Sequence, residues 1–342
     1  MLSTRVTLKD ISEACGYSAN TVSRALRDDP RLPESTRTRI QEKAREMGYI
    51  RNYLASTLRS GKSHNVAVIV NDLRNLHFCY MLDIMDRALR KAGYNMMVLC
   101  MQMDEDLGEQ LIHTAISQAV DGIMYFPYHN NRRHIEYMEQ NRVPFVLLDR
   151  WIENVFTNTV RCDDVQGGRL AAEHLARLGH RRFLFLSSSP LSSSQPDRYQ
   201  GFMEGIRACG LDESAVREIP GEVVEPLLSE MALESLLFPM DYTAIVCFRD
   251  EMAFAVMTTL YERGYAVPRD VSVISFDHLC AFMPYLPRIT SIYAEQGDVA
   301  SRGIQMLLNH IENPDEPVRE EVLPVRVFDE GTTGAPPASA AQ

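Results

Sequence analysis

The sequence has few of the residue patterns that build metal centres or disulfide frameworks. Its seven cysteines are odd in number, scattered and never spaced as CxxC, and its histidines form no HxxxH pair. Scattered, unpaired cysteines are typical of reduced thiols in a cytoplasm and argue against a disulfide scaffold. We therefore expect a cytoplasmic protein that holds no metal and no cofactor.

Membrane and catalytic signals are also absent. No stretch is apolar over the length that a membrane span requires, and the first residues do not resemble a signal peptide. The serine clusters at 187–189 and 192–194 are not set in a GxSxG elbow, and no triad, metal cluster or phosphate-cradling glycine loop is found. These absences argue against a membrane protein and against an enzyme.

Charge is divided unequally along the chain. Residues 1–62 carry 12 Lys and Arg and seven Asp and Glu, a balance of +5, whereas the remainder carries 23 basic and 39 acidic residues, a balance of −16. Neutralisation of phosphates drives nucleic-acid affinity, so this division predicts that only the basic segment meets a polyanion.

The segment Val6–Arg27 predicts two short helices joined by a turn at Gly16. Thr7 is a candidate N-cap with Asp10 three residues later, and Ser18 begins the second helix. The second helix would turn small, polar or basic side chains away from its apolar side: Ala19, Asn20, Thr21, Ser23 and Arg24. This arrangement is typical of a helix-turn-helix, whose second helix enters the DNA major groove. An ordinary helical hairpin is the alternative.

A third helix is expected over residues 34–47, with Gly48 as its stop, which completes a compact headpiece. After it, Asn52 is a candidate cap for one short helix that ends at Ser60-Gly61. A helix of this length is not expected to be stable alone in water, so it would form only when something holds it.

From Asn65 the sequence alternates between apolar runs and amphipathic stretches. Strands are expected over residues 66–70, 95–100, 122–126, 145–148, 183–187, 244–247, 271–275 and 321–328. Helices are expected over residues 78–92, 107–119, 132–140, 165–178, 197–208, 226–237, 251–263 and 301–312. The fold class is therefore an all-α headpiece followed by a bilobed α/β domain of two doubly wound parallel sheets, with ligands bound at the carboxyl ends of the strands.

Ordered landmarks along the chain indicate a family. Residues 6–26 read VTLKDISEACGYSANTVSRAL, followed by Thr36-Arg37 and by MGYI at 47–50. Further landmarks are VDGI at 120–123, Gly167-Gly168, HLARLGH at 174–180, RYQGF at 198–202, VPRDVSVI at 267–274 and PRITSI at 287–292. Through these motifs the chain resembles, along nearly its whole length, the lactose-repressor (LacI/GalR) family of bacterial transcription regulators.

The resemblance implies that the headpiece reads an operator in double-stranded DNA. Ala19 and Asn20 occupy base-reading positions, and Arg24 matches a third contact to a base or phosphate. The other implied DNA-binding residues are Thr7, Ser18, Thr21, Ser23, Tyr49 and Asn52, and helix capping remains the plain alternative for Thr7 and Ser18. Residues 52–59 match the family's hinge helix, in which Leu58 aligns with a leucine that enters the minor groove. Arg51, where many relatives have proline, is either a phosphate contact or a solvated side chain.

The resemblance also implies an effector cleft between the lobes. Arg198 and Asp277 match ligand-binding positions, and Phe276 precedes Asp277. His77 and Phe78 lie where relatives place ring-stacking side chains, although a core position is the alternative for Phe78. Asp149, followed by Arg150, ends another strand at the cleft, and its alternative is an ion pair between lobes.

One departure from the family concerns CFRD at 247–250, where relatives commonly end in Asn-Asp. Arg249 replaces that asparagine, and an arginine at a strand end pairs bidentately with a carboxylate or phosphate. This predicts an acidic or phosphorylated sugar as effector. The alternative is that Arg249 pairs with a nearby acid such as Asp250 or Asp277.

Four segments follow from these inferences: a headpiece at 1–51, a hinge helix and linker at 52–62, an effector-binding and dimerisation domain at 63–330, and a disordered tail at 331–342. The N-lobe is expected to comprise about 63–162 and 292–324, and the C-lobe about 163–291 and 325–330. We expect a homodimeric repressor of carbohydrate-metabolism genes that binds a pseudo-palindromic operator under control of a sugar, sugar acid or sugar phosphate, and that joins the nucleoid when bound to DNA. The alternative is a sugar-binding protein of a transport or sensing system, which would need a signal peptide and would not need residues 5–62.

Overall fold

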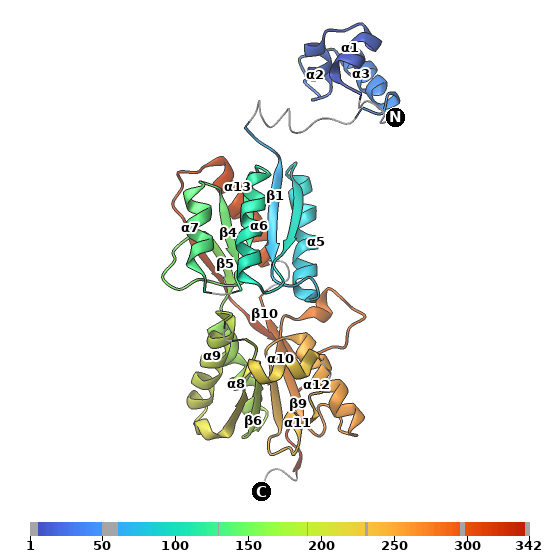
Figure 1. The fold of residues 1–342 in the computed structure, drawn as a ribbon. Helices are drawn as coiled ribbons and strands as arrows, with labels where there is room; N and C mark the ends of the chain where they lie inside the picture. The colour runs from blue at the N-terminus through green and yellow to red at the C-terminus, as the bar shows by residue number, and fades with distance from the viewer. Residues whose placement is uncertain are drawn as a thin grey trace. The chain divides into compact units, whose positions relative to one another are not determined.

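The computed structural model describes residues 6–49, 61–128, 130–189, 191–229, 232–294 and 298–338, and Figure 1 shows it as a ribbon. The chain divides into two compact units, Met1–Ser63 and His64–Gln342. The predicted hinge helix at 52–59, with Asn52 and Leu58, lies outside the described residues, as does Arg51.

The first unit contains a headpiece of three helices: α1 (Leu8–Cys15), α2 (Ala19–Ala25) and α3 (Glu34–Glu46). Each helix contributes a fully buried residue to one small core, namely Ile11, Val22 and Ile40. The predicted capping box is confirmed, because the Thr7 side chain accepts from the backbone of Asp10 and the Asp10 carboxylate accepts from the Thr7 N–H at 2.7 Å. Both exchanges satisfy amides that the first turn of a helix leaves without partners.

The second unit contains two six-stranded sheets, each the centre of one lobe. In the first sheet all strands are parallel and lie in the order β11-β5-β4-β3-β1-β2. Its strands are β1 (Asn65–Val70), β2 (Asn95–Cys100), β3 (Gly122–Tyr125), β4 (Phe145–Leu148), β5 (Thr159–Cys162) and β11 (Glu320–Leu323). The helices of this lobe are α5 (Leu76–Lys91), α6 (Glu105–Ser117), α7 (Arg132–Gln140) and α13 (Asp298–Glu312) (Figure 1).

The second sheet lies in the order β12-β10-β9-β8-β6-β7, with β12 antiparallel to β10 and the other pairs parallel. Its strands are β6 (Phe183–Leu186), β7 (Val216–Ile219), β8 (Ala244–Cys247), β9 (Ser272–Phe276), β10 (Ser291–Tyr293) and β12 (Arg326–Phe328). Its helices are α8 (Asp164–Arg177), α9 (Ser194–Ala208), α10 (Gly221–Ser229), α11 (Glu234–Leu237), α12 (Asp250–Glu262) and the short 3-10 helices η1 (Glu213–Ala215) and η2 (Leu279–Ala281).

Both sheets have the order expected of doubly wound folds. The central strands are mostly apolar, and every residue of the run 66–70 is fully buried because helices cover both faces. In each sheet the chain reverses its winding beside one strand, which is β1 in the first sheet and β6 in the second. Ligands of such folds bind at the carboxyl ends of the strands near that reversal. The predicted fold class is confirmed.

Several predicted elements differ from the structure. The short strands β5, β7 and β10 were not predicted, and the segment 321–328 forms two strands, one in each sheet. Residues from 292 were expected in the first lobe, but β10 pairs with β9 and β12 in the second sheet. The single helix expected at 226–237 is two helices, with Pro226 inside α10 rather than at a helix start.

The predicted disorder of the tail is wrong for residues 331–338. Thr332 donates from its hydroxyl to the carbonyl of Val273 at 2.7 Å, and the carbonyl of Gly334 lies 2.8 Å from Nε2 of the buried His180. These bonds satisfy polar groups buried beside the second sheet, which would be costly to leave without partners. Residues 339–342 lie outside the described residues. No helix among the described residues is long and apolar enough to span a membrane.

Candidate functional site

The predicted DNA-reading residues follow one side of α2. Ser18, Ala19 and Asn20 are exposed, whereas Val22 and Ala25 on the opposite side are fully buried. Thr21, Ser23 and Arg24 are half-buried. The helix therefore carries an apolar face for the headpiece core and leaves its first turn open to another molecule.

Two of the predicted phosphate contacts also cap helices. The Ser18 hydroxyl accepts from the Thr21 N–H at 3.2 Å and bonds the Thr21 hydroxyl at 2.9 Å, and Thr7 caps α1. The capping role is thus present for both Thr7 and Ser18, and their phosphate contacts stay predictions. Tyr49 is half-buried and packs against the headpiece core.

Arg24 is held at the end of α2 by an ion pair. Its Nε donates to Asp29 at 3.0 Å, and Arg31 donates to the same carboxylate at 2.8 Å. The hydrogen bonds from Arg31, followed by that from Arg24, hold the pKa of Asp29 well below its usual range. The carboxylate is therefore ionised and fixes the Arg24 guanidinium beside the loop that follows the helix.

The second unit has a pocket of about 470 Å³, including its solvent-filled mouth. It lies at the carboxyl ends of strands from both sheets, since Asp149 follows β4, Arg249 follows β8 and Asp277 follows β9. Its lining residues are Asn75, His77, Phe78, Asp149, Arg150, Cys162, Asp164, Ser194, Arg198, Phe248, Arg249, Asp277 and Tyr293. Six of the seven predicted effector residues line it, and the seventh, Phe276, lies against Arg198.

Arg198, on α9, is the most constrained side chain of the pocket. Its guanidinium lies between the rings of Phe248 and Phe276, with centroids 4.5 and 4.4 Å away. Nε donates to Asp164 at 2.7 Å and Nη1 donates to the Phe248 carbonyl at 2.6 Å. Burial would lower the pKa of Arg198, but the carboxylates of Asp164 and Asp277 outweigh it and raise that pKa. The residue is therefore a permanently charged, pre-positioned donor.

His77 and Asp149 form a buried pair within the first lobe. His77 Nε2 lies 2.7 Å from a carboxylate oxygen of Asp149, and Tyr293 meets the imidazole edge-on at 5.5 Å. Burial alone would lower the pKa of His77, but the Asp149 carboxylate raises it to about 9. Burial alone would raise the pKa of Asp149, but the charge and hydrogen bond of His77 outweigh burial and lower it. At neutral pH the pair is an imidazolium and a carboxylate. Phe78 both lines the pocket and packs on Phe126, so its predicted core position is also realised.

Arg249 is paired with a protein carboxylate. Nη1 and Nη2 donate to the two oxygens of Glu225 at 2.7 and 2.8 Å, and the Ser188 hydroxyl donates to the same carboxylate at 2.7 Å. Burial would lower the pKa of Arg249, but the hydrogen bonds and charge of Glu225 raise it. The partner is neither Asp250 nor Asp277, the acids expected from sequence, but a residue of α10.

Asp250 is occupied elsewhere. Its carboxylate accepts from the Leu279 N–H at 2.7 Å and from the hydroxyls of Ser291, at 3.0 Å, and Ser275. Burial, with the charge of Asp277, raises the pKa of Asp250 to about 8. Asp250 therefore joins α12 to β9 and β10 behind the pocket instead of facing Arg249.

Six lining residues were missed from sequence: Asn75, Cys162, Asp164, Ser194, Phe248 and Tyr293. Arg150 also lines the pocket; the sequence placed it at the cleft beside Asp149 but gave it no ligand-binding role. Cys162 and Tyr293 end β5 and β10, so the rule that ligands bind at strand ends would have found them once those strands were recognised. Asp164 begins α8 and lines the pocket beside Arg198, and the sequence holds no local signal for the pairing of these two residues.

A second hollow adjoins the pocket through Arg150, which lines both. It measures about 510 Å³ with its open side and is lined by Pro127, Tyr128, Asn130, Arg150, Trp151, Glu153, Leu191, Ser193 and Pro196. Trp151, the one tryptophan of the sequence, donates from its indole to Asp197 on α9 at 2.9 Å. This bond joins the two lobes at the edge of the hollow.

Comparison with known families matches two parts of the chain. Residues 7–52 match the bacterial regulatory proteins of the lacI family, and residues 172–333 match a periplasmic binding protein-like domain. The chain is 23% identical over 312 residues to the HTH-type transcriptional repressor PurR of Mannheimia succiniciproducens, covering 90% of this chain and 93% of that protein. It is 27% identical over 326 residues to the HTH-type transcriptional regulator GntR of Pseudomonas aeruginosa, covering 93% and 92%.

Solved structures share this fold over most or nearly all of the chain. The Lac repressor dimer bound to operator and the anti-inducer ONPF has a TM-score of 0.82 at 24% identity, covering 97% of this chain and 100% of that one. A LacI family transcriptional regulator from Enterococcus faecium with bound ribose has a TM-score of 0.70 at 22% identity, covering 79% and 98%. These solved structures show the shared fold. The family matches over residues 7–52 and 172–333, together with the relatives matched along most of the chain, show that the chain belongs to the LacI family, as a non-enzymatic DNA-binding transcriptional regulator with a periplasmic-binding-protein-like effector domain.

Proposed function

We propose that this regulator is a homodimeric repressor of carbohydrate-metabolism genes that binds a pseudo-palindromic operator and is controlled by a sugar-type effector. The observation that supports this most is the pocket, in which charged side chains from both lobes surround one space. A ligand there would contact both lobes at once, so its binding would change the free-energy balance between lobe arrangements. Relatives named as repressors, and one solved with an operator, support the DNA-binding half of the proposal.

Contacts between the two lobes would transmit the effect of ligand binding. The Leu76 N–H, on the first lobe, donates to the carboxylate of Glu251 in α12 at 2.9 Å. Tyr80 of α5 stacks on Phe282, which follows η2, with ring centroids 3.4 Å apart. Both contacts lie next to elements that line the pocket, so a ligand that draws Asp149 and Asp277 together would strain or tighten them. A small change between lobes would then reach the segment that leads to the headpiece.

The proposed DNA contacts are those expected from sequence. Ala19 and Asn20 would read bases from the first turn of α2, since a short apolar or amide side chain there reaches base edges. Arg24, Thr7, Ser18, Thr21, Ser23 and Tyr49 would contact phosphates or bases, and Asn52 and Leu58 would act from the hinge. Two such headpieces related by a twofold axis require a pseudo-palindrome.

The lining of the pocket supports a hydroxyl-rich effector. Asp149, Asp277 and Asn75 offer acceptors, Arg198 and Arg150 offer donors, and the rings of Phe78, Phe248 and Tyr293 offer apolar faces. This mixture of polar groups and rings suits a sugar ring, whose hydroxyls lie at the edge and whose C–H groups form the faces. Ribose in a relative's complex is consistent with this class of ligand.

An anionic group on the effector would have to take the place of Glu225. Both terminal nitrogens of Arg249 already donate to that carboxylate, so a sugar acid or sugar phosphate gains its bidentate pair only by displacing Glu225. Displacement leaves a partly buried carboxylate without its cation, which costs free energy. We therefore propose a neutral sugar as the first choice and retain a sugar acid or sugar phosphate as the second.

The experiment is a binding titration of the full-length protein with neutral sugars, sugar acids and sugar phosphates. Fluorescence of Trp151 reports on the lobe junction, and calorimetry measures the affinity. The matched variants are Glu225→Gln and Glu222→Gln, the latter an exposed glutamate on the same helix. If the effector is anionic, Glu225→Gln should tighten its binding by releasing Arg249, and Glu222→Gln should not. Tight binding of a neutral sugar, with an affinity that neither variant changes, supports the first choice.

Operator binding is tested separately by selecting bound fragments from random-sequence DNA. A pseudo-palindromic consensus, bound with an affinity that depends on the identified sugar, is the expected result. Selection of a single half-site by a monomer, or binding that no sugar of the panel alters, would refute the proposed mode of regulation.

A further inference from the structure

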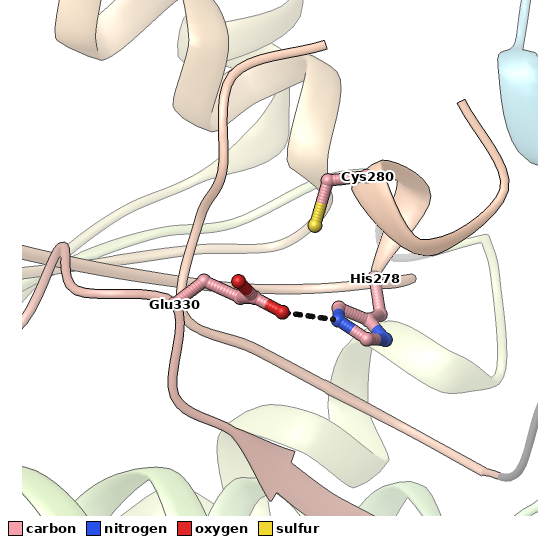
Figure 2. Close-up of side chains that lie close together, drawn as sticks. All are labelled: His278, Cys280 and Glu330. Atoms are coloured by element: carbon pink, nitrogen blue, oxygen red, sulfur yellow. Dashed lines mark hydrogen bonds and ion pairs between the residues drawn. The ribbon is translucent and has the colours of Figure 1, made fainter. Parts of the chain in front are cut away.

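Three metal-ligating side chains converge outside the effector pocket. His278 lies at the start of η2, Cys280 lies within η2, and Glu330 follows β12, so the donors come from two segments far apart in sequence. Figure 2 shows the Cys280 sulfur and the Glu330 carboxylate directed toward the His278 imidazole. One nitrogen, one sulfur and one oxygen donor lie within 4.8 Å of one another. We propose that this cluster is a binding site for a divalent transition-metal ion of the Zn²⁺ class.

The separation of the donors supports this assignment. His278 Nε2 and Glu330 Oε1 are 3.3 Å apart, which is longer than the 2.7–2.9 Å typical of a charge-assisted hydrogen bond. Two light ligands at about 2.0 Å from a tetrahedral Zn²⁺ are about 3.3 Å apart, and a sulfur at about 2.3 Å lies about 3.5 Å from each. The nitrogen and oxygen already have that spacing, and the sulfur lies at most about 1.3 Å farther from either of them than this geometry requires. Water would supply the fourth ligand.

The histidine is fixed in orientation before any metal binds. Its side chain is 6% exposed, and its ring stacks on Phe328 with centroids 3.9 Å apart. The backbone N–H of His278 donates to the Ser291 hydroxyl at 3.0 Å. Burial lowers the pKa of His278, against the opposing effect of Glu330. Its Nδ1 is buried without a hydrogen-bond partner in the described structure.

The other two donors are partly open to solvent, which gives an ion a way in. The Glu330 side chain is 20% exposed and Cys280 is half-buried. Arg288 donates to the second oxygen of Glu330 at 2.7 Å and leaves Oε1 directed at His278. The Arg288 side chain is 77% exposed, so it is free to turn toward water when an ion neutralises the carboxylate. Burial raises the pKa of Cys280, and a bound ion would remove its proton.

This site was not expected from sequence because its pattern is not a contiguous motif. His278-x-Cys280 is too short a signal on its own, and Glu330 is brought to it only by the pairing of β12 with β10. A bound ion would tie η2 to the strand end at Glu330 and would stabilise the backbone that follows Asp277.

The experiment uses the full-length protein, freed of metal with a chelator and titrated with Co²⁺ and then Zn²⁺. We expect one Co²⁺ per chain, a near-ultraviolet sulfur-to-cobalt charge-transfer band, loss of that band on adding Zn²⁺, and a higher melting temperature with Zn²⁺. Cys280→Ser should abolish the band, and Glu330→Gln should weaken Zn²⁺ binding at least tenfold. The matched control is Cys209→Ser, which changes an exposed cysteine elsewhere and should leave the band intact.

Circular dichroism of each variant separates lost binding from lost folding. Cys280→Ser replaces one atom, and Glu330→Gln changes a partly exposed side chain, so at least one of them should fold. A charge-transfer band that survives Cys280→Ser, or that disappears in Cys209→Ser, would overturn the assignment. So would a wild-type protein that binds no Co²⁺ through sulfur.

Discussion

At the scale of single residues, Arg198 and Asp164 show how the pocket depends on buried charge. Both side chains are at most 10% exposed, and the 2.7 Å bond between them compensates for the loss of water on each side. Arg198→Ala would leave Asp164 buried and unpaired, which typically costs about 3–5 kcal/mol. We expect a loss of that size in the free energy of unfolding, together with loss of effector binding.

Urea denaturation, followed by Trp151 fluorescence, measures this effect. The matched control is Arg207→Ala, on the same helix, because Arg207 pairs with Glu213 and both side chains are more than half exposed. Exposed pairs contribute little, so this variant should unfold at the wild-type urea concentration. Equal destabilisation by both variants would show that the buried pair has no special role.

The pair of His77 and Asp149 predicts a pH dependence of stability. The pKa of His77 is raised to about 9 from its usual value near 6.5, so folding favours the protonated imidazole. The stabilisation is complete below about pH 6.5 and is lost as the pH rises through about 9; it amounts to about 3 kcal/mol. The unfolding free energy of the wild type should therefore decline between pH 6.5 and 9. In Asp149→Asn this decline should be smaller, and urea denaturation across that pH range measures it.

The comparison with Asp149→Asn is essential because a second buried group titrates nearby. The pKa of Asp250 is raised to about 8, so its ionisation also destabilises the fold as the pH rises. That contribution is common to the wild type and to Asp149→Asn, and it cancels in their difference. A difference that does not depend on pH would contradict the assignment of the imidazolium to His77.

At the scale of elements, the pairing of α8 with α9 positions Arg198. A Cβ on Gly201 would lie 1.9 Å from the carbonyl oxygen of Val165, and one on Gly168 would lie 2.0 Å from the carbonyl oxygen of Arg198. The two helix backbones are therefore in direct contact, and only glycine fits at these positions.

Gly201→Ala should force the two helices apart. Overpacking of this kind typically costs about 1–3 kcal/mol, and it would displace Arg198, one turn earlier on α9, from Asp164. We expect a lower melting temperature and weaker effector binding by calorimetry. Gln200→Ala, at the neighbouring exposed position of the same helix, should change neither. Normal effector affinity in Gly201→Ala would show that helix spacing does not set the position of Arg198.

The elements that sequence reasoning found are those with a strong local pattern. Strands β1, β3, β4 and β8 are apolar runs buried on both faces, and their periodicity needs no knowledge of the fold. Strands β7 and β10 were missed because they are only four and three residues long, and β7 reads Val-Arg-Glu-Ile with its two charged residues exposed. Such strands form because a neighbouring strand offers hydrogen bonds.

The same distinction holds for the site. Asp277 was predicted from the family resemblance, and Asp149 from its place at the end of a strand facing the cleft. Both follow strands, and the alternating fold brings strand ends together. Glu225 was not predicted, because its pairing with Arg249 depends on how α10 packs over the second sheet, 24 residues away in sequence. The composition of the tail predicted disorder. The Thr332 hydroxyl nevertheless bonds the carbonyl of Val273 and the N–H of Thr290, which are buried, and composition alone gives no sign of such partners.

At the scale of the whole molecule, the division of charge predicts which unit binds DNA and how binding depends on salt. Residues 1–62 carry a balance of +5 and the remainder −16, so residues 64–342 alone should bind the sugar but show no affinity for DNA, even at low salt. The full chain should lose affinity for its operator steeply as salt rises, because each neutralised phosphate releases counterions.

Asn20→Ala should cost about 1–3 kcal/mol of binding free energy at the selected operator without changing that salt dependence, since an amide reads bases and neutralises no phosphate. Fluorescence anisotropy of labelled operator across a salt series measures both effects. DNA binding by residues 64–342, or a shallower salt dependence in Asn20→Ala, would assign DNA recognition to different residues from those of α2.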